Sequence, residues 1–270
     1  MCSLQILTRI DTLKNELNSY RPLTKSEVKR LREEFLINFT YNSNAIEGNT
    51  LTLQETALII NEGITIGEKS LREHFEVIGH REACLYLEEL VKEQAELSDK
   101  VIKDIHSLVL MDQRDSKGVY RRVPVVIMGA AHTPPQPYLV PIRMEQLIQN
   151  YDQNNSNHII ERVARFHLDF EVVHPFIDGN GRTGRLLLNF ELMKHGYPPI
   201  NIKYSDRKKY YSCFTSYHTQ KDPTEMVLLV AESVEAEIQR YIQIVKMANE
   251  IATTNYFQEV SKQDEQEIEI

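Results

Sequence analysis

The chain has 270 residues, and its 39 acidic residues outnumber 31 basic ones, which gives a net charge of −8 at pH 7. This length can bury a core without disulfides or metals, and the acidic balance argues against a broad nucleic-acid-binding face, which needs excess positive charge. Cys2, Cys84 and Cys213 are far apart and form no CxxC pattern. Neither a disulfide framework nor a zinc site is therefore expected.

The chain shows no sign of a membrane span or a signal peptide. Its first residues are polar and soon charged, unlike a secretory leader. The longest uncharged stretch, 123–142, is interrupted by several prolines, so it cannot form the helix of about 20 apolar residues that spans a bilayer. We expect a cytoplasmic protein with neither a membrane nor a nucleic acid as partner.

Helical periodicity dominates the first part of the chain. Thr24 with Glu27, and Ser70 with Glu73, fit the capping box, in which two residues satisfy each other's backbone N–H groups. Ser98 is a further candidate cap. Helices are expected over residues 24–41, 71–97 and 98–111.

The pattern changes at 123–128, an apolar run rich in β-branched residues. The proline-rich turn 132–137 and the short apolar segment 138–140 follow it, so a small β-hairpin is predicted here. Helical periodicity then resumes, and the polar residues 261–270 are expected to fray. Helices are expected over 142–154, 157–173, 182–195, 206–220 and 224–247. The predicted fold is mainly α, a helical bundle with a β-hairpin.

Residues 174–185, His-Pro-Phe-Ile-Asp-Gly-Asn-Gly-Arg-Thr-Gly-Arg, combine groups that bind and act on phosphate. The segment precedes the apolar run 186–192 and is therefore predicted to be a loop that leads into a helix. The first turn of a helix offers unpaired N–H groups and partial positive charge. Gly179 and Gly181 allow backbone amides to curl around an anion. The segment therefore predicts a phosphate site.

The side chains of this segment suit such a site. Arg182 and Arg185 lie on one face of the helix start, where cations oppose the helix dipole, which indicates that they bind an anion. Asp178 suits Mg²⁺, which one or two carboxylates and phosphate oxygens hold. Asn180 can donate its amide to phosphate, and His174 can take a proton near neutral pH. A glycine-rich turn with solvated arginines is the weaker interpretation.

The segment meets every position of the Fic family signature, H-P-F-x-[D/E]-G-N-G-R-x-x-R, and the chain thus resembles that family. The resemblance implies a helical core with a β-hairpin flap. It also implies Mg²⁺-dependent transfer of AMP from ATP to a Ser, Thr or Tyr hydroxyl of a protein, including the chain itself. The expected organisation is an N-terminal helical extension with the inhibitory helix (1–68), a Fic catalytic domain (69–250) and a polar C-terminal tail (251–270).

The resemblance also implies a role for each position of the signature. His174 is implied as the general base, Asp178 as the metal ligand and Phe176 as the buried anchor of the loop. Arg182 is implied to contact the β-phosphate and Arg185 the γ-phosphate. The implied phosphate-binding set is Gly179, Asn180, Gly181, Arg182, Thr183, Gly184 and Arg185.

A second motif, Ser-Asn-Ala-Ile-Glu-Gly-Asn, lies upstream at 43–49. On a helix Ser43 and Glu47 share a face, and Gly48 suits the helix end. Alone the pattern is typical of a solvated helix end, but beside the first motif it resembles the Fic inhibitory motif [S/T]-x-x-x-E-[G/N]. The resemblance implies an intramolecularly inhibited, class II protein in which Glu47 gives Arg185 a carboxylate in place of the γ-phosphate.

The predicted hairpin resembles the family's flap, which aligns a target segment by adding it as a strand. The flap positions that match residues flanking the nucleotide in relatives are Ile127, Met128, Gly129 and Ala130.

The helix after residue 206 supplies aromatic side chains. Tyr210 matches a nucleotide-contacting tyrosine of the family, and His218 stands where some relatives carry an asparagine at the adenine. Tyr211 and Tyr217 are expected to pack in the core, and His167 is expected to be structural.

The sequence leaves several functions open. An autoinhibited protein adenylyltransferase is the leading hypothesis. A second hypothesis is a de-AMPylating phosphodiesterase or dual-activity enzyme, in which Glu47 positions a water. A third is transfer of a different nucleotide, because the loop contacts phosphates rather than the base. A non-catalytic nucleotide-sensing module is disfavoured because His174 and Asp178 are both present. A homodimer is compatible with the resemblance.

Overall fold

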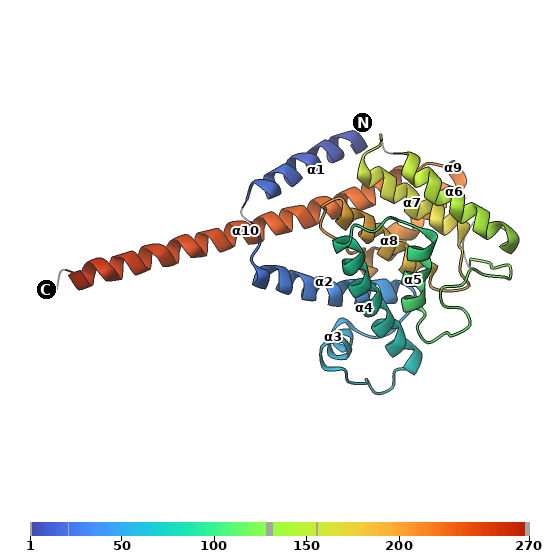
Figure 1. Cartoon of the computed structure of the whole chain (residues 1–270), viewed down its shortest axis with the longest axis horizontal. Helices are drawn as coiled ribbons and strands as arrows, with labels where there is room; N and C mark the ends of the chain where they lie inside the picture. Colours follow the sequence, from blue (N-terminus) through green and yellow to red (C-terminus); the bar gives the residue numbers. More distant parts are fainter. Residues whose placement is uncertain (1, 21, 128–131, 155, 268–270) are drawn as a thin grey trace.

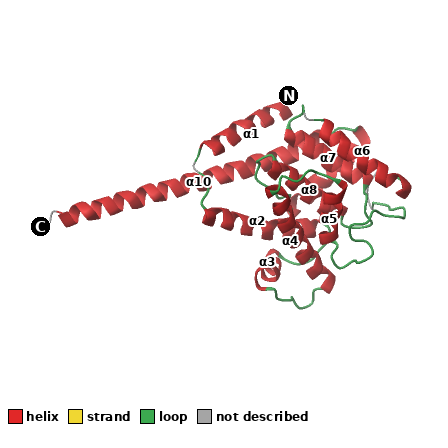
Figure 2. Cartoon of the chain, viewed as in Figure 1, coloured by secondary structure: helices red, strands yellow, loops and turns green. Residues whose placement is uncertain are grey.

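The computed structural model describes residues 2–20, 22–127, 132–154 and 156–267. Helices joined by loops make up this part of the chain (Figures 1 and 2). The helices are α1 (Cys2–Ser19), α2 (Lys25–Ile46), α3 (Leu53–Glu62), α4 (Leu71–Lys92), α5 (Asp99–Val109), α6 (Val140–Gln153), α7 (Ile159–Val173), α8 (Asn180–Lys194), α9 (Arg207–Gln220) and α10 (Thr224–Glu267), with 3₁₀ turns η1 (Pro137–Leu139) and η2 (Tyr204–Asp206).

Side-chain caps fix the starts of the N-terminal helices. The capping boxes predicted at Thr24 and Ser70 are confirmed. Each hydroxyl accepts a hydrogen bond from the backbone N–H of the glutamate three residues later, and the side chain of that glutamate accepts one from the backbone N–H of the cap residue. A third box at Thr52 begins α3 and was missed. α2 continues past its predicted end to Ile46, so Ser43 lies on its last turn.

Helix α8 forms the centre of the core. Its residues from Arg182 to Leu192 are all buried, and α7, α4, α5 and α2 contact it. A helix that is buried on every side fits the apolar run that follows the signature. Because close-packed interiors resist displacement, the groups at the N-terminus of α8 stand on a rigid base.

The β-hairpin predicted over 123–140 is wrong for the described residues. These form no strand, and the expected return strand is the turn η1, which continues directly into α6 (Figure 2). The prolines of this segment explain the difference, because proline cannot donate to a strand ladder. The buried Arg121 organises the segment instead, since its guanidinium donates to the carbonyls of Pro135 and His174.

Helix α10 packs against α1 and α7 and then projects beyond the rest of the chain (Figure 1). The sequence predicted its end near residue 247 and a frayed polar tail, but the helix continues to Glu267. No glycine or proline interrupts 248–267, and its Ala, Glu, Gln and Lys residues favour helix. In the described part of the chain, no helix combines the length and apolar composition that crossing a membrane requires.

Candidate active site

Two tight turns shape the loop between α7 and α8. His174 ends α7 in the left-handed conformation, with φ of 47°, and its N–H bonds the Phe170 carbonyl. A residue with a Cβ rarely adopts this conformation, which bends the chain sharply away from the helix axis. Gly179, with φ of 75°, makes the second turn immediately before α8.

Phe176 and Asn180 fix the loop from inside. The buried Phe176 ring stacks on His106, with centroids 3.5 Å apart and planes 4° from parallel. The Asn180 amide accepts the Phe176 N–H at 2.9 Å and donates to the Phe176 carbonyl at 3.0 Å. Phe176 thus has the geometry of the predicted anchor. The Asn180 side chain holds the loop. Its predicted hydrogen bond to phosphate stays a prediction.

Arg185 is 2% exposed and is held by the end of α2. Its Nε donates to Ser43 Oγ at 3.0 Å, and Nη2 donates to the Ser43 carbonyl and to Glu47 Oε1, both at 2.8 Å. Burial alone would lower the pKa of Arg185, but Tyr210 and Glu47 outweigh it, so the pKa is raised. The structure therefore brings the second motif and the signature together.

Arg182 is equally buried, but its charge is loosely paired. Its Nη2 lies 3.5 Å from Asp178 Oδ1, and its Nη1 lies 3.6 Å from Glu76 Oε1. Nε and Nη1 of Arg182 are buried and meet no hydrogen-bond acceptor in the described part of the chain. A buried guanidinium with unfilled donors suits an anion such as a phosphate group.

Asp178 lies beside this cation. Its Oδ1 accepts the Gly179 N–H at 2.6 Å, and its Oδ2 accepts from Arg72 at 2.9 Å. Burial alone would raise the pKa of Asp178, but Arg182, the Gly179 N–H and Arg72 hold it below its ordinary value. The carboxylate is therefore ionised at neutral pH, and with 39% of its side chain exposed it can reach a divalent cation.

Two glycines of α8 allow close approach by other elements. A Cβ at Gly181 would overlap Oε1 of Glu47, and one at Gly184 would lie 2.8 Å from the His167 ring. Thr183, which lies between the two glycines in the sequence, is fully buried. Gly181 thus faces the candidate anion site, whereas Thr183 is buried and Gly184 lies against His167 and Glu171. Their role in phosphate binding stays a prediction.

A cavity of about 410 Å³ lies between the α7–α8 turn, α9 and the end of α2. Its lining residues are Glu47, Ile127, Glu171, His174, Gly181, Arg185, Tyr210, Tyr211, Phe214, Thr215 and His218. Glu171 was not predicted from the sequence. It lies three residues before His174, but the left-handed turn at His174, rather than helical spacing, fixes their contact. Tyr211 was expected in the core, whereas this ring is 45% exposed and lines the cavity.

Tyr210 connects the cavity to the core. Its hydroxyl lies 2.7 Å from His167 Nε2 and accepts from Arg185 Nη1 at 3.4 Å. Burial raises the pKa of Tyr210, so the phenol stays protonated. His167 is fully buried, in line with the structural role predicted for it. Tyr217 packs against the core as expected.

The remaining wall of the cavity comes from the loop before η1 and from α9. Ile127 lines the cavity, as predicted, while Met128, Gly129 and Ala130 lie outside the described residues. His218 also lines it, and its ring stacks on His132 with centroids 4.5 Å apart.

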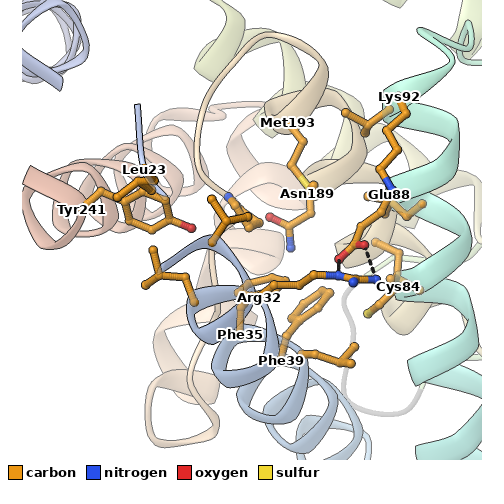
Figure 3. A pocket seen from close by; sticks show the side chains of 17 residues that line it. Leu23, Arg32, Phe35, Phe39, Cys84, Glu88, Lys92, Asn189, Met193 and Tyr241 are labelled. Atoms are coloured by element: carbon orange, nitrogen blue, oxygen red, sulfur yellow. Dashed lines mark hydrogen bonds and ion pairs between the residues drawn. The ribbon is translucent and has the colours of Figure 1, made fainter. Parts of the chain in front are cut away.

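A second cavity, of about 400 Å³, lies between α2, α4 and α8 and has mostly apolar walls (Figure 3). Phe35 and Phe39 of α2 form one side, and Arg32 pairs with Glu88 of α4 at 2.6 Å (Figure 3). The walls of this second cavity are mostly apolar, whereas the cavity at His174 combines a carboxylate, an imidazole and a buried guanidinium. We therefore place the chemistry at His174.

Known proteins resemble this chain over most of its length. A family model described as the Fic/DOC family matches residues 96–192, which include the signature. The protein adenylyltransferase fic-1 of Caenorhabditis elegans is 35% identical over 252 residues, covering 91% of this chain and 48% of that protein. Protein adenylyltransferase Fic of Drosophila grimshawi is 32% identical over 240 residues, covering 87% and 49%. The chain thus spans about half the length of the curated relatives it matches.

Solved structures extend the likeness to the fold. A fragment of C. elegans Fic-1 superposes with a TM-score of 0.81 at 33% identity, covering 92% of this chain and 74% of that one. A Fic-domain signalling protein from Bacteroides thetaiotaomicron superposes with a TM-score of 0.79 at 25% identity, covering 89% and 97%. This chain belongs to the Fic family.

Proposed function

We propose that this chain is a protein adenylyltransferase, which transfers AMP from ATP to a Ser, Thr or Tyr hydroxyl of a protein, and that Glu47 restrains it. The observation that carries the proposal is the placement of His174 in one cavity with Arg185, together with the buried Arg182, three residues earlier on α8, whose Nε and Nη1 have no acceptor in the described part of the chain. The names of the curated relatives, protein adenylyltransferases, support the same activity.

The N-terminus of α8 would receive the triphosphate. Arg182 and Arg185 would bind its outer phosphates, with backbone N–H groups of the first turn adding partial positive charge. Asp178 would hold Mg²⁺, and the cation would supply charge neutralisation on the phosphates. For this Arg72 must leave Asp178, which its side-chain exposure of 61% permits.

His174 would then act on the target hydroxyl. As the hydroxyl oxygen forms its bond to the α-phosphorus, the imidazole takes the hydroxyl proton. The bond from the α-phosphorus to the bridging oxygen breaks, and pyrophosphate leaves. Such a reaction depends on positioning and on charge neutralisation more than on covalent catalysis.

The position of Glu47 would hinder the binding of ATP in this arrangement. Its Oε1 accepts from Arg185 at 2.8 Å and lies directly against the backbone at Gly181. A γ-phosphate that pairs with Arg185 must displace this carboxylate, so the two anions compete for one guanidinium.

Intact-protein mass after incubation with Mg-ATP tests the proposal. We expect a gain of one AMP in Glu47→Gly, a small gain in wild type and none in Glu47→Gly with His174→Ala. Glu62→Gln, an exposed change at the end of α3, is the control and should behave as wild type. If Glu47→Gly labels neither itself nor any protein of a cell extract, adenylyl transfer is excluded, and labelling with another nucleotide would identify a different transferred group.

Hydrolysis of AMP–protein bonds is the second candidate function. The observation that favours it is the carboxylate of Glu47, which lines the same cavity as His174 and could position a water there. We expect wild type to release AMP from a target modified beforehand and Glu47→Gly to lose this release. Equal release by both proteins would exclude a hydrolytic role for Glu47.

A further inference from the structure

We propose that Glu171 is a positioning residue that holds His174 as the Nδ1–H tautomer and so leaves Nε2 free to act as the base. The inference rests on the proposed function. Glu171 lies on the last turn of α7, three residues before His174, and its Oε2 is 3.2 Å from His174 Nδ1. The contact is within ion-pair distance, although the buried Nδ1 is not aligned for a hydrogen bond. Such contacts tighten when substrate binds.

The exposure of the His174 ring shows which nitrogen faces the cavity. Nδ1 is buried, yet 20% of the side chain is exposed and the ring lines the cavity. The exposed edge is therefore the one that carries Nε2. A histidine whose buried nitrogen meets a carboxylate keeps its proton on that nitrogen, because the carboxylate can only accept.

The surroundings of Glu171 argue against a purely structural role. Its side chain is 12% exposed, and its Oε1 is buried without a hydrogen-bond partner in the described part of the chain. A carboxylate that served packing would have both oxygens satisfied by backbone or hydroxyl donors, since burying an unpaired charge is costly. The other oxygen, Oε2, faces His174, and this contact explains why position 171 carries a carboxylate.

Charged and titratable groups face Glu171 from each element packed around it. Burial alone would raise the pKa of Glu171, but His174, His167 and Arg185 outweigh it and hold the pKa below its ordinary value. Tyr210, Tyr211 and His218 of α9 and Glu47, just after α2, also face it across the cavity. The carboxylate is therefore charged when the imidazole takes its proton.

The backbone of α8 holds Glu171 in place. A Cβ at Gly184 would lie 3.1 Å from Glu171 Oε1 and 2.8 Å from the His167 ring, so only a glycine lets α8 approach this closely. The rigid core helix thus presses on the side of the carboxylate away from His174. This contact limits the rotamers open to Glu171 and directs Oε2 toward the imidazole.

The pair assists one step of the proposed reaction. While the hydroxyl oxygen bonds to the α-phosphorus and pyrophosphate departs, the hydroxyl proton moves to His174 Nε2. The ring becomes an imidazolium, and Glu171 stabilises that positive charge. Without the carboxylate the ring can also adopt the Nε2–H tautomer, which cannot accept the proton.

Kinetics in the Glu47→Gly background give the first test. We expect Glu171→Gln to lower kcat by up to about 10⁴-fold, because it populates the tautomer that cannot accept the proton, with KM for Mg-ATP changed less than about twofold. Glu161→Gln, the same change on the first turn of α7, is the matched control and should keep the parent kcat. A loss that lies in KM, or an unchanged kcat, would overturn the proposal.

The tautomer itself gives a second test that needs no turnover. In protein with ¹⁵N-labelled histidine, the two-bond ¹⁵N–¹H correlations of His174, assigned by their loss in His174→Ala, should show the Nδ1–H form in wild type and a mixture in Glu171→Gln. Wild type in the Nε2–H form would exclude the proposed role. If the Glu47→Gly parent transfers no nucleotide, the proposed function fails, yet this measurement still decides how Glu171 acts on His174.

Discussion

Glu47 and Gly181 are in direct contact, with the carboxylate of Glu47 packed where any side chain at position 181 would begin. The same carboxylate accepts a hydrogen bond from Arg185 at 2.8 Å. Gly181 therefore provides the space that lets Glu47 reach Arg185.

The effect of Gly181→Ala on the free energy of unfolding should change sign between wild type and the Glu47→Gly background. In wild type, the added methyl group displaces Glu47 and should lower the free energy of unfolding by about 1–3 kcal/mol. In the Glu47→Gly background the overlap with Glu47 is gone and only the Arg185 side chain, 3.1 Å from the added Cβ, has to shift. Alanine in a helix should then be neutral or stabilise by up to about 1 kcal/mol. Urea denaturation of the four proteins in a double-mutant cycle measures the difference. Additive effects would show that Glu47 does not occupy this position.

Arg121 links the loop before η1 to the signature loop. It is 4% exposed, and it donates to the His174 carbonyl at 2.8 Å and to the Pro135 carbonyl at 2.6 Å. Arg121→Ala leaves these part-buried acceptors without their charged donor and should lower the free energy of unfolding by about 3 kcal/mol. Chemical denaturation checks the value. The exposed Arg122→Ala is the control, and equal stability of both variants would contradict the assigned contacts.

Local signals in the sequence predicted what depends on short-range chemistry. The capping boxes at Thr24 and Ser70 placed two helix starts correctly, because a hydroxyl and a glutamate three residues apart satisfy backbone groups without help from the rest of the fold. The signature loop was placed correctly at the start of α8 for the same reason, since its glycines and apolar flank are local.

Features that depend on tertiary contacts were harder to predict. The predicted β-hairpin is wrong because the prolines of the segment disfavour strand pairing more than its β-branched residues favour it. Hydrogen bonds from the buried Arg121 hold the segment in place of strand pairing. Glu171 was missed because its partner is fixed by the left-handed turn at His174, which no pattern of residues announces. The domain boundaries, a homodimer and a cytoplasmic location stay predictions.

Acid should destabilise the protein through His167. Burial lowers the pKa of His167 to about 4, against an ordinary value of 6.5. Between these values the unfolded chain binds more protons than the folded one, so the free energy of unfolding falls as the pH falls from 6.5 to 4. His167→Gln should make that slope shallower by up to about 1.4 kcal/mol per pH unit. Denaturation at several pH values measures it.

Some slope should persist in His167→Gln, because burial also lowers the pKa of His106 to about 4. A slope that is equal in wild type and His167→Gln would show that His167 is protonated to the same extent in both states.

Ser43 should stabilise the fold by accepting hydrogen bonds from Arg185. Its hydroxyl accepts from Arg185 Nε at 3.0 Å in a buried setting, and its carbonyl accepts from Nη2 at 2.8 Å. Ser43→Ala removes the hydroxyl but keeps the carbonyl, so one charged N–H loses its acceptor, at a cost of about 2 kcal/mol in the free energy of unfolding. Ser26→Ala, on the exposed first turn of the same helix, should cost less than about 0.5 kcal/mol. If Ser43→Ala costs as little as Ser26→Ala, the guanidinium must find another acceptor, and α2 would hold Arg185 through Glu47 and the Ser43 carbonyl.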